Sequence, residues 1–356
     1  MKIGSVEGIV SDALQVVYDS GELAGTATSI SIAVAGDTNQ DYILLSRGIN
    51  AINGTGYTVL RLNNDSGNNY SSRYFNAAST TVSTGNTAPS TFIGVPTYGS
   101  ALNDNSWSKI DIHIKSGHYS ASVSQLGHGI ATVFGNCQMR AECWAVTNAV
   151  TTIDIVGSAA NAIGIGSRFI LLQRQNTTGM DAGNVEVQGT VDGALQLIHE
   201  STIPSEVATY TISSLNGNSD VVYYFEATCV DSDIVGAWTL LINNDTSANN
   251  CIYQYLYYSG SAISGNQASS AGMFISSTST DSNVGFTNGW IYAKSGYKRP
   301  AMFLESRNCV DDSVGDLVFW HFAWKDTSTN ITSLVISCQT DEMQVLSNFK
   351  LYRINL

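Results

Sequence analysis

Short runs in which apolar and polar residues alternate dominate this sequence. Residues 29–34, 111–114 and 152–155 carry β-branched side chains at every second position. Such positions share one face of an extended chain, so each run predicts a strand with one buried side. Clusters of Gly, Asn, Asp and Ser, as at 35–39 and 63–69, separate the runs and are typical of turns. The pattern predicts an all-β protein of short antiparallel strands without long helices.

Segments from the first half of the chain return in the second half. Residues 62–66 (Leu-Asn-Asn-Asp-Ser) return at 242–246 (Ile-Asn-Asn-Asp-Thr), and Trp144 returns as Trp324. Six such anchors follow the same order, each pair roughly 180 residues apart. A nearly constant spacing does not arise from biased composition. It predicts two tandem copies of one domain, with the paired tryptophans at equivalent core positions.

The repeat also divides the chain. At 356 residues, the length suits two domains that each bury a core. We expect two tandem antiparallel β-sandwich domains of jelly-roll-like topology. The predicted parts are an N-terminal arm (1–12), β-sandwich domain 1 (13–175), a linker (176–193) and β-sandwich domain 2 (194–356).

Composition and charge argue against two classes of partner, nucleic acids and membranes. The net charge is −13, and the basic residues are scattered along the chain rather than clustered. A protein that binds nucleic acid gains much of its affinity from clustered Lys and Arg, so no nucleic-acid partner is expected. The first residues do not resemble a secretion signal, and no window approaches 18 apolar residues. We therefore expect no membrane partner and synthesis in the cytoplasm.

Cysteine usage points to structural thiols. None of the six cysteines forms a Cys-x-x-Cys pair. We interpret them as reduced, buried small hydrophobic residues, although spacing alone leaves a disulfide open. They are Cys137, Cys143, Cys229, Cys251, Cys309 and Cys338.

The loops at 63–65 and 243–245 are rich in oxygen donors, which suits Ca²⁺. Each loop has only one carboxylate, however, and Asn and Asp also stabilise turns through their own side chains. We expect the turn role. The histidines show no metal-ligand spacing: His113, His118, His128, His199 and His321.

Two pairs of adjacent acids, at 311–312 and 341–342, are the candidates for glycoside hydrolysis. That reaction needs two carboxyls held across a cleft, and acids in Ser/Asn-rich loops usually face water. No nucleophile accompanies a base, and no Gly-rich segment has the context of a phosphate loop. We expect no catalytic residues, no metal and no cofactor.

Aromatic residues are a stronger functional lead. Tyr253, Tyr255, Tyr257 and Tyr258 follow Trp238 in the second copy and exceed what a core strand requires. Alternate Tyr side chains can form a glycan platform or a protein interface. In the alternative interpretation, one face of this strand is core and the other packs on the sister domain.

The N-terminal arm lies outside the repeat. Its apolar residues Ile3, Val6, Ile9 and Val10 have no role in a core that the second copy builds without them. We expect an assembly arm that adds to an exposed sheet edge of a neighbouring subunit. The alternative is pairing with its own sandwich or with the linker near Val185.

Four segments carry a resemblance to a known family. They are residues 14–20, residues 60–70, the Ile-Tyr-Ala-Lys-Ser-Gly run at 291–296 and residues 324–334. At these anchors both copies resemble a domain that recurs in structural proteins of tailed bacteriophages. The sequence departs from that pattern at His113-Ile114 and at Ser247, so the copies have diverged.

This resemblance implies a non-enzymatic virion protein that is made in the host cytoplasm. We expect a capsid accessory or decoration (cement-like) protein, or a neck or tail component, that is a homo-oligomer. Its partners would be major capsid, neck or tail proteins, bound through many weak contacts. The alternative is a receptor- or carbohydrate-binding tail fibre module with a host glycan as ligand, although the sequence lacks a fibrous shaft.

Overall fold

Nearly all of the regular secondary structure in the described residues is β-strand, with one short helix, α1 (Gly217–Asp220). The structure is a computed structural model. The predicted arm and linker lie outside the described residues, as do Asp311, Asp312 and Asp341, whereas Glu342 is exposed. The structure describes residues 14–34, 40–78, 81–99, 102–115, 118–128, 134–146, 148–174, 195–230, 237–247, 249–259, 262–277, 284–307, 316–338 and 342–354.

The first half forms two antiparallel sheets. An eight-stranded sheet has the order β1-β12-β3-β8-β9-β10-β5-β6, and a four-stranded sheet has the order β2-β11-β4-β7. The strands are β1 (Leu14–Asp19), β2 (Ser29–Ala33), β3 (Gln40–Ile49), β4 (Gly56–Leu62), β5 (Tyr70–Ala78), β6 (Thr81–Ser90), β7 (Ile93–Gly99), β8 (Asn105–Lys115), β9 (His118–His128), β10 (Phe134–Trp144), β11 (Thr152–Gly157) and β12 (Arg168–Arg174).

The second half forms two sheets of the same sizes, with the orders β13-β24-β15-β20-β21-β22-β17-β18 and β14-β23-β16-β19. Its strands are β13 (Leu195–Thr202), β14 (Thr209–Ile212), β15 (Val222–Val230), β16 (Ala237–Ile242), β17 (Cys251–Ser259), β18 (Ala262–Ser270), β19 (Met273–Ser277), β20 (Val284–Tyr292), β21 (Arg299–Arg307), β22 (Asp316–Trp324), β23 (Leu334–Cys338) and β24 (Asn348–Ile354).

Both halves have the same strand order, so every strand of the first half has a counterpart in the second. Each half is a sandwich in which an eight-stranded sheet packs on a four-stranded one. The all-β fold of two tandem antiparallel sandwiches, predicted from the alternation, is therefore confirmed.

Each sandwich has its own core between its two sheets. Leu44, Ile112 and Ile155 belong to the first core, and Phe225 and Phe322 belong to the second. Strand alternation explains this placement. In β22 the side chains of Val318, Trp320, Phe322 and Trp324 all join the second core, because they share one face of the strand.

The two Asn-Asn-Asp loops each form a hydrogen bond with a buried tryptophan, and the two tryptophans occupy equivalent positions in the two sandwiches. Trp144 and Trp324 are buried, and each indole Nε1–H donates to the aspartate of its loop, at 2.7 Å for Asp65 and 2.9 Å for Asp245. The two preceding asparagines of each loop adopt positive φ. These aspartates also accept hydrogen bonds from within their own loops. The loops thus serve as turns that anchor the core tryptophans.

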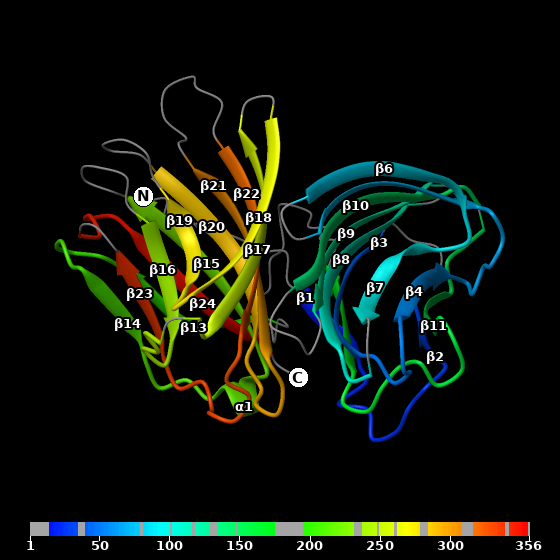
Figure 1. Cartoon of the computed structure of the whole chain (residues 1–356), viewed down its shortest axis with the longest axis horizontal. Helices are drawn as coiled ribbons and strands as arrows, with labels where there is room; N and C mark the ends of the chain where they lie inside the picture. The colour runs from blue at the N-terminus through cyan, green and yellow to red at the C-terminus, as the bar shows by residue number, and fades with distance from the viewer. Residues whose placement is uncertain are drawn as a thin grey trace, which may run out of the picture.

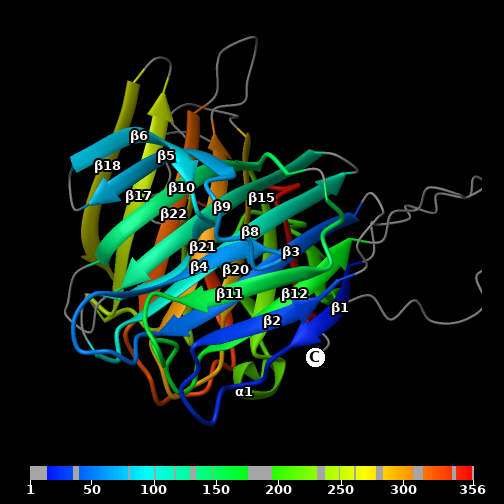
Figure 2. The ribbon, with the colours of Figure 1, turned by 90° about the vertical axis from the view of Figure 1, so that its right-hand side faces the viewer.

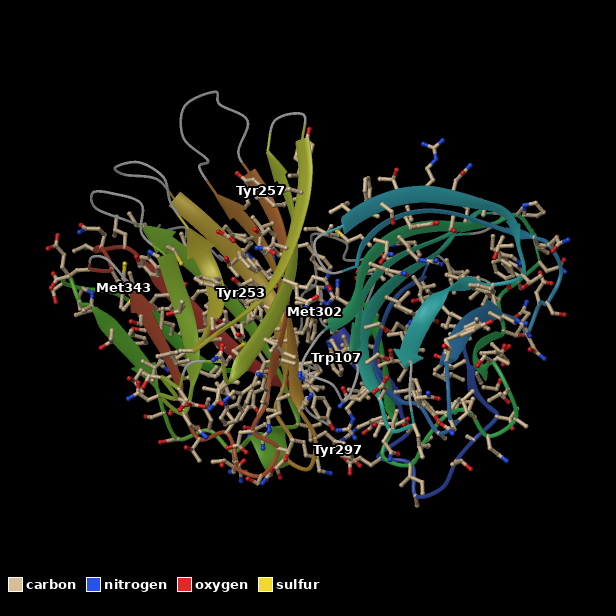
Figure 3. The ribbon with its side chains drawn as sticks, in the orientation of Figure 1. Trp107, Tyr253, Tyr257, Tyr297, Met302 and Met343 are labelled. Carbon is tan, nitrogen blue, oxygen red and sulfur yellow. The ribbon has the colours of Figure 1, made fainter. Side chains whose placement is uncertain are left out.

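The two eight-stranded sheets face each other across the middle of the molecule, with the four-stranded sheets outermost (Figure 1). Viewed from the side, the strands of one eight-stranded sheet run across those of the other (Figure 2). A buried cluster joins the halves and includes Leu45 and Trp107 from the first and Trp290, Tyr292 and Met302 from the second. Trp107 and Met302 lie at this seam (Figure 3).

A buried arginine fixes one end of the seam. Arg47 donates to the Tyr292 hydroxyl (2.5 Å), to Glu22 (3.2 Å) and to the Gly166 carbonyl. Its guanidinium also lies 3.9 Å from the ring centroid of Tyr297. Burial opposes ionisation of Glu22, but Arg47 and a lysine of the second half outweigh it and lower the pKa of this carboxyl. The seam is thus held by both apolar and ionic contacts.

The cysteine prediction needs one correction. Cys229, Cys251 and Cys338 are buried thiols, as expected, but Cys143 is exposed. It lies on β10 next to Trp144, and alternation turns neighbouring side chains to opposite faces of the strand. The Cys137 side chain and Cys309 lie outside the described residues.

Candidate functional site

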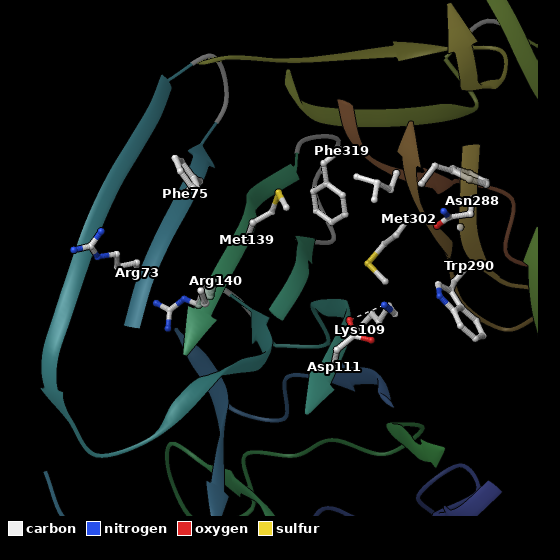
Figure 4. Close-up of a pocket in the computed structure, with 14 residues that line it drawn as sticks. Arg73, Phe75, Lys109, Asp111, Met139, Arg140, Asn288, Trp290, Met302 and Phe319 are labelled. Atoms are coloured by element: carbon white, nitrogen blue, oxygen red, sulfur yellow. Dashed lines mark hydrogen bonds and ion pairs between the residues drawn. The ribbon is translucent and has the colours of Figure 1, made fainter. Parts of the chain in front are cut away.

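A cavity of about 630 Å³ lies between the two eight-stranded sheets (Figure 4). One wall comes from β5, β8 and β10 of the first half, and the other comes from β20, β21 and β22 of the second. The residues that line it are Arg73, Phe75, Lys109, Asp111, Met139, Arg140, Ala141, Asn288, Gly289, Trp290, Met302, Phe303, Leu304 and Phe319.

The two walls differ in charge. The first-half wall carries Lys109 and Asp111, which pair at 2.6 Å, and also Arg73 and Arg140. Arg140 donates to Gln138. The second-half wall has no charged residue among those that line the cavity. Met302, Trp290 and Phe319 project into the space from it (Figure 4). The site therefore combines a large apolar surface with a few basic groups on one side.

A smaller cavity of about 190 Å³ adjoins the first, because three residues line both. We call it the seam groove, and its lining is almost wholly apolar. Its floor is closed by a small buried cluster in which Leu256 and Phe319 pack near Met139. The residues that line the seam groove are Phe75, Met139, Leu256, Tyr257, Tyr258, Leu317 and Phe319.

The predicted aromatic platform is divided by strand alternation. Tyr253, Tyr255 and Tyr257 on β17 pack against the second core, with Tyr255 4.8 Å from Trp320 between ring centroids. Tyr253 lies inside the second sandwich (Figure 3). Of this strand's tyrosines, only Tyr258 is exposed, and it lies at the seam groove.

Trp238 was expected to lie with this platform, and that expectation is wrong as to its exposure. Its side chain is 0% exposed and packs in the second core, 6.2 Å from Phe349 between ring centroids. β16 is an inner strand of the four-stranded sheet, so one of its faces is covered by the eight-stranded sheet. The alternative interpretation, in which β17 has a core face and a face toward the sister domain, describes the structure better.

The residues that dominate the groove were not predicted from the sequence, among them Phe75, Met139, Leu317 and Phe319. One signal for them was present. β22 reads Leu-Val-Phe-Trp-His-Phe-Ala-Trp after its first residue, a run that is apolar except for His321 and has no polar alternation. Such a run indicates a strand covered on both faces, and the sandwich core covers only one of them.

One buried histidine lies on this same face of β22. Neither ring nitrogen of His321 has a hydrogen-bond partner among the described residues, and its ring lies 4.4 Å from that of Phe319. Burial lowers the pKa of His321 to about 3, so the imidazole is neutral at physiological pH. His113 contacts Asp41, and His199 contacts Tyr210.

Within the described ranges, no three His, Cys, Asp or Glu residues are grouped as a metal would require. No helix in the described part of the chain has the length and apolar character needed to span a membrane. No family model and no curated protein matches this chain. The resemblance to bacteriophage structural proteins therefore stays a prediction that rests on the residues quoted for it.

Proposed function

We propose that this protein is a non-enzymatic structural subunit of a tailed-bacteriophage virion. Within the particle it would be an accessory or decoration (cement-like) protein of the capsid, or a neck or tail component. The tandem sandwich fold and the four segments that resemble such proteins support the setting. Fold alone does not define a function, so the proposal rests on a surface feature.

The apolar seam groove is the observation that carries the proposal. Phe75, Tyr258 and Leu317 each expose 41% of their surface around it. Contiguous exposed apolar patches on a soluble chain usually mark a contact with another macromolecule. In a virion, many identical copies each add such a contact, and avidity makes the assembly stable although each contact is weak.

The second candidate, a glycan-binding fibre module, has less support. Sugar binding of the predicted kind needs several aromatic side chains side by side and open to water. Three of the tyrosines pack against the core, Trp238 is buried, and Tyr258 alone faces out. A groove lined by aliphatic and aromatic carbon suits a protein segment better than a sugar, which needs polar partners as well.

The proposal is tested on particles of the virus that encodes this chain. Quantitative mass spectrometry of gradient-purified virions should find the chain in many copies relative to the major capsid protein. Particles that lack it should lose their DNA at a lower temperature if it decorates the capsid, or should assemble without tails if it belongs to the neck or tail. Its absence from purified virions would refute the proposal.

A further inference from the structure

An exposed apolar patch extends beyond the seam groove across one face of the second sandwich. Tyr258 pairs with Leu317 in the register of β17 and β22, and Leu304 pairs with Phe319 in the register of β21 and β22. Phe286 on β20 lies in the same row as Leu317, with one serine between them. The exposed fractions of Leu304 and Phe286 are 37% and 43%. These side chains form one surface rather than scattered exposed residues.

Two leucines of this patch belong to the second copy and not to the shared fold, whereas the position of Phe286 holds Trp107 in the first copy. Aligning the two sheets by Trp144 and Trp324 places Ser124 opposite the position of Leu304 and Cys137 opposite that of Leu317. The first copy thus carries smaller residues where the second exposes leucines. A feature present in only one of two duplicated domains indicates a role that the common fold does not require.

The N-terminal arm carries apolar side chains that an apolar groove can bury. Within residues 1–12, Ile3, Val6, Ile9 and Val10 are apolar. The described strands alone give both copies the same strand orders, so the shared fold does not require residues 1–12. An extended segment with apolar side chains suits a narrow apolar groove, because it buries its side chains there without disturbing the fold.

We propose that the arm of one copy lies in the seam groove of a second copy, so that subunits are joined head to tail. This inference rests on the proposed structural function and names the partner of its surface. It also replaces the sheet edge, expected from the sequence, by the groove between the two sandwiches. The arm carries two acidic residues, Glu7 and Asp12, and one basic residue, Lys2, and the groove has Arg73 nearby, two residues from Phe75 on the same face of β5. Among the described residues, no hydrogen bond or ion pair is found for the Arg73 side chain, which is exposed.

Chain length favours a second copy over the arm's own groove. The arm leaves from Leu14 on β1, and β5 lies six strands away in the same sheet. At about 4.8 Å per strand, the path along the sheet is about 29 Å. Val10 and Ile9 reach at most about 14 Å and about 18 Å from Leu14, even when fully extended. Val10 and Ile9 cannot enter the groove of their own chain, although Val6 and Ile3 span about 29 Å and about 40 Å when fully extended. The groove of a neighbour has no such limit for any of the four.

A head-to-tail contact has a consequence for assembly. Each subunit donates an arm and offers a groove, so the contact is heterologous and generates a ring or an open chain of subunits. Such a contact allows one small chain to spread over a larger particle. A head-to-tail contact also predicts that a subunit with a defective arm can still bind a subunit with a defective groove, because each keeps the half of the contact that the other lacks.

The test uses two variants of the full chain. Ile9→Asp combined with Val10→Asp removes a functional arm, and Leu317→Asp removes a functional groove. Each variant alone should self-associate at least about 100-fold more weakly in sedimentation velocity, because an unpaired carboxylate would have to be desolvated in an apolar contact. Mixing the two should restore a 1:1 heterodimer that grows no further, since each subunit keeps only one working half of the contact.

Leu197→Asp is the matched control, because Leu197 is an equally exposed leucine (45%) on β13, at the opposite edge of the same sheet. It should self-associate like the parent chain, and far-UV circular dichroism with thermal melting should show that all variants fold. A monomeric parent chain, an arm variant that assembles normally, or a mixture that forms no heterodimer would each overturn the inference. If mass spectrometry still finds the chain in virions, the proposed function stands while the arm contact fails.

Discussion

Replacing Asp65 by alanine should destabilise the first sandwich, because it leaves one buried hydrogen-bond donor without its acceptor. The carboxylate accepts hydrogen bonds from Trp144 Nε1 (2.7 Å), Asn69 Nδ2 (2.8 Å) and the backbone N–H of Gly67 (2.8 Å). Trp144 is buried, so its N–H would lose its partner at a cost of about 1–3 kcal/mol. The other two donors can turn to water and add little. We expect a loss of about 1–3 kcal/mol in the free energy of unfolding.

Urea unfolding followed by tryptophan fluorescence measures this loss, and the duplication supplies a matched variant. Asp245→Ala should cost a similar amount in the second sandwich, because Asp245 accepts from Trp324 in the same way. Replacing Trp144 by phenylalanine removes the donor. In that background, the Asp65→Ala cost should therefore fall by about 1–2 kcal/mol, and the double-mutant cycle reports this coupling.

The pH dependence has a defined sign. Burial alone would raise the pKa of Asp65, but the hydrogen bonds that it accepts outweigh burial and lower it. A carboxyl whose pKa is lower in the folded state contributes stability above its unfolded pKa and loses it as pH falls toward the folded pKa. The cost of Asp65→Ala should thus shrink in acid. A cost below about 0.5 kcal/mol at neutral pH, or one that is independent of Trp144, would refute this reasoning.

Three further outcomes are expected at the seam. Gly166→Ala should destabilise the protein by about 1–3 kcal/mol in urea unfolding, because Gly166 has φ +83° and a Cβ would lie 2.0 Å from the Tyr297 hydroxyl; an unchanged midpoint would contradict this. Arg47→Met should cost about 2–4 kcal/mol, since it leaves Glu22 with one cationic partner fewer, and a stability equal to that of the parent chain would argue against an ionic role for Arg47. Burial lowers the pKa of His321 to about 3 in the folded state, whereas a histidine in the unfolded chain has a pKa of about 6.5. Between these two pH values the unfolded chain binds one proton more than the folded chain, so the free energy of unfolding should decline as pH falls below about 6.5. The His321→Leu variant should show a weaker decline in thermal melting between neutral pH and pH near 4, and an identical decline would exclude this histidine as its cause.

The sequence alone predicted the fold from two regularities. Period-two alternation indicated strands with one buried face, and the repeat at a nearly constant spacing indicated tandem copies. Both depend on local spacing and order along the chain, which a single sequence contains in full. The Asn-Asn-Asp loops followed the same logic, since Asp65 and Asp245 act within a few residues of their own turns. Their contacts with Trp144 and Trp324 could not be read in this way, because those residues are distant in the chain.

Only the tertiary structure decided what covers the second face of each eight-stranded sheet. Alternation separates the two faces of a strand, but it does not show which face meets a core, a sister domain or water. Of the five aromatic residues proposed as a platform, Tyr258 is exposed, Trp238 is buried, and the other three tyrosines pack against the second core. The seam groove brings together Phe75 and Phe319 from different halves of the chain. Their proximity results from how the two sandwiches pack, and no local pattern in either strand encodes that packing.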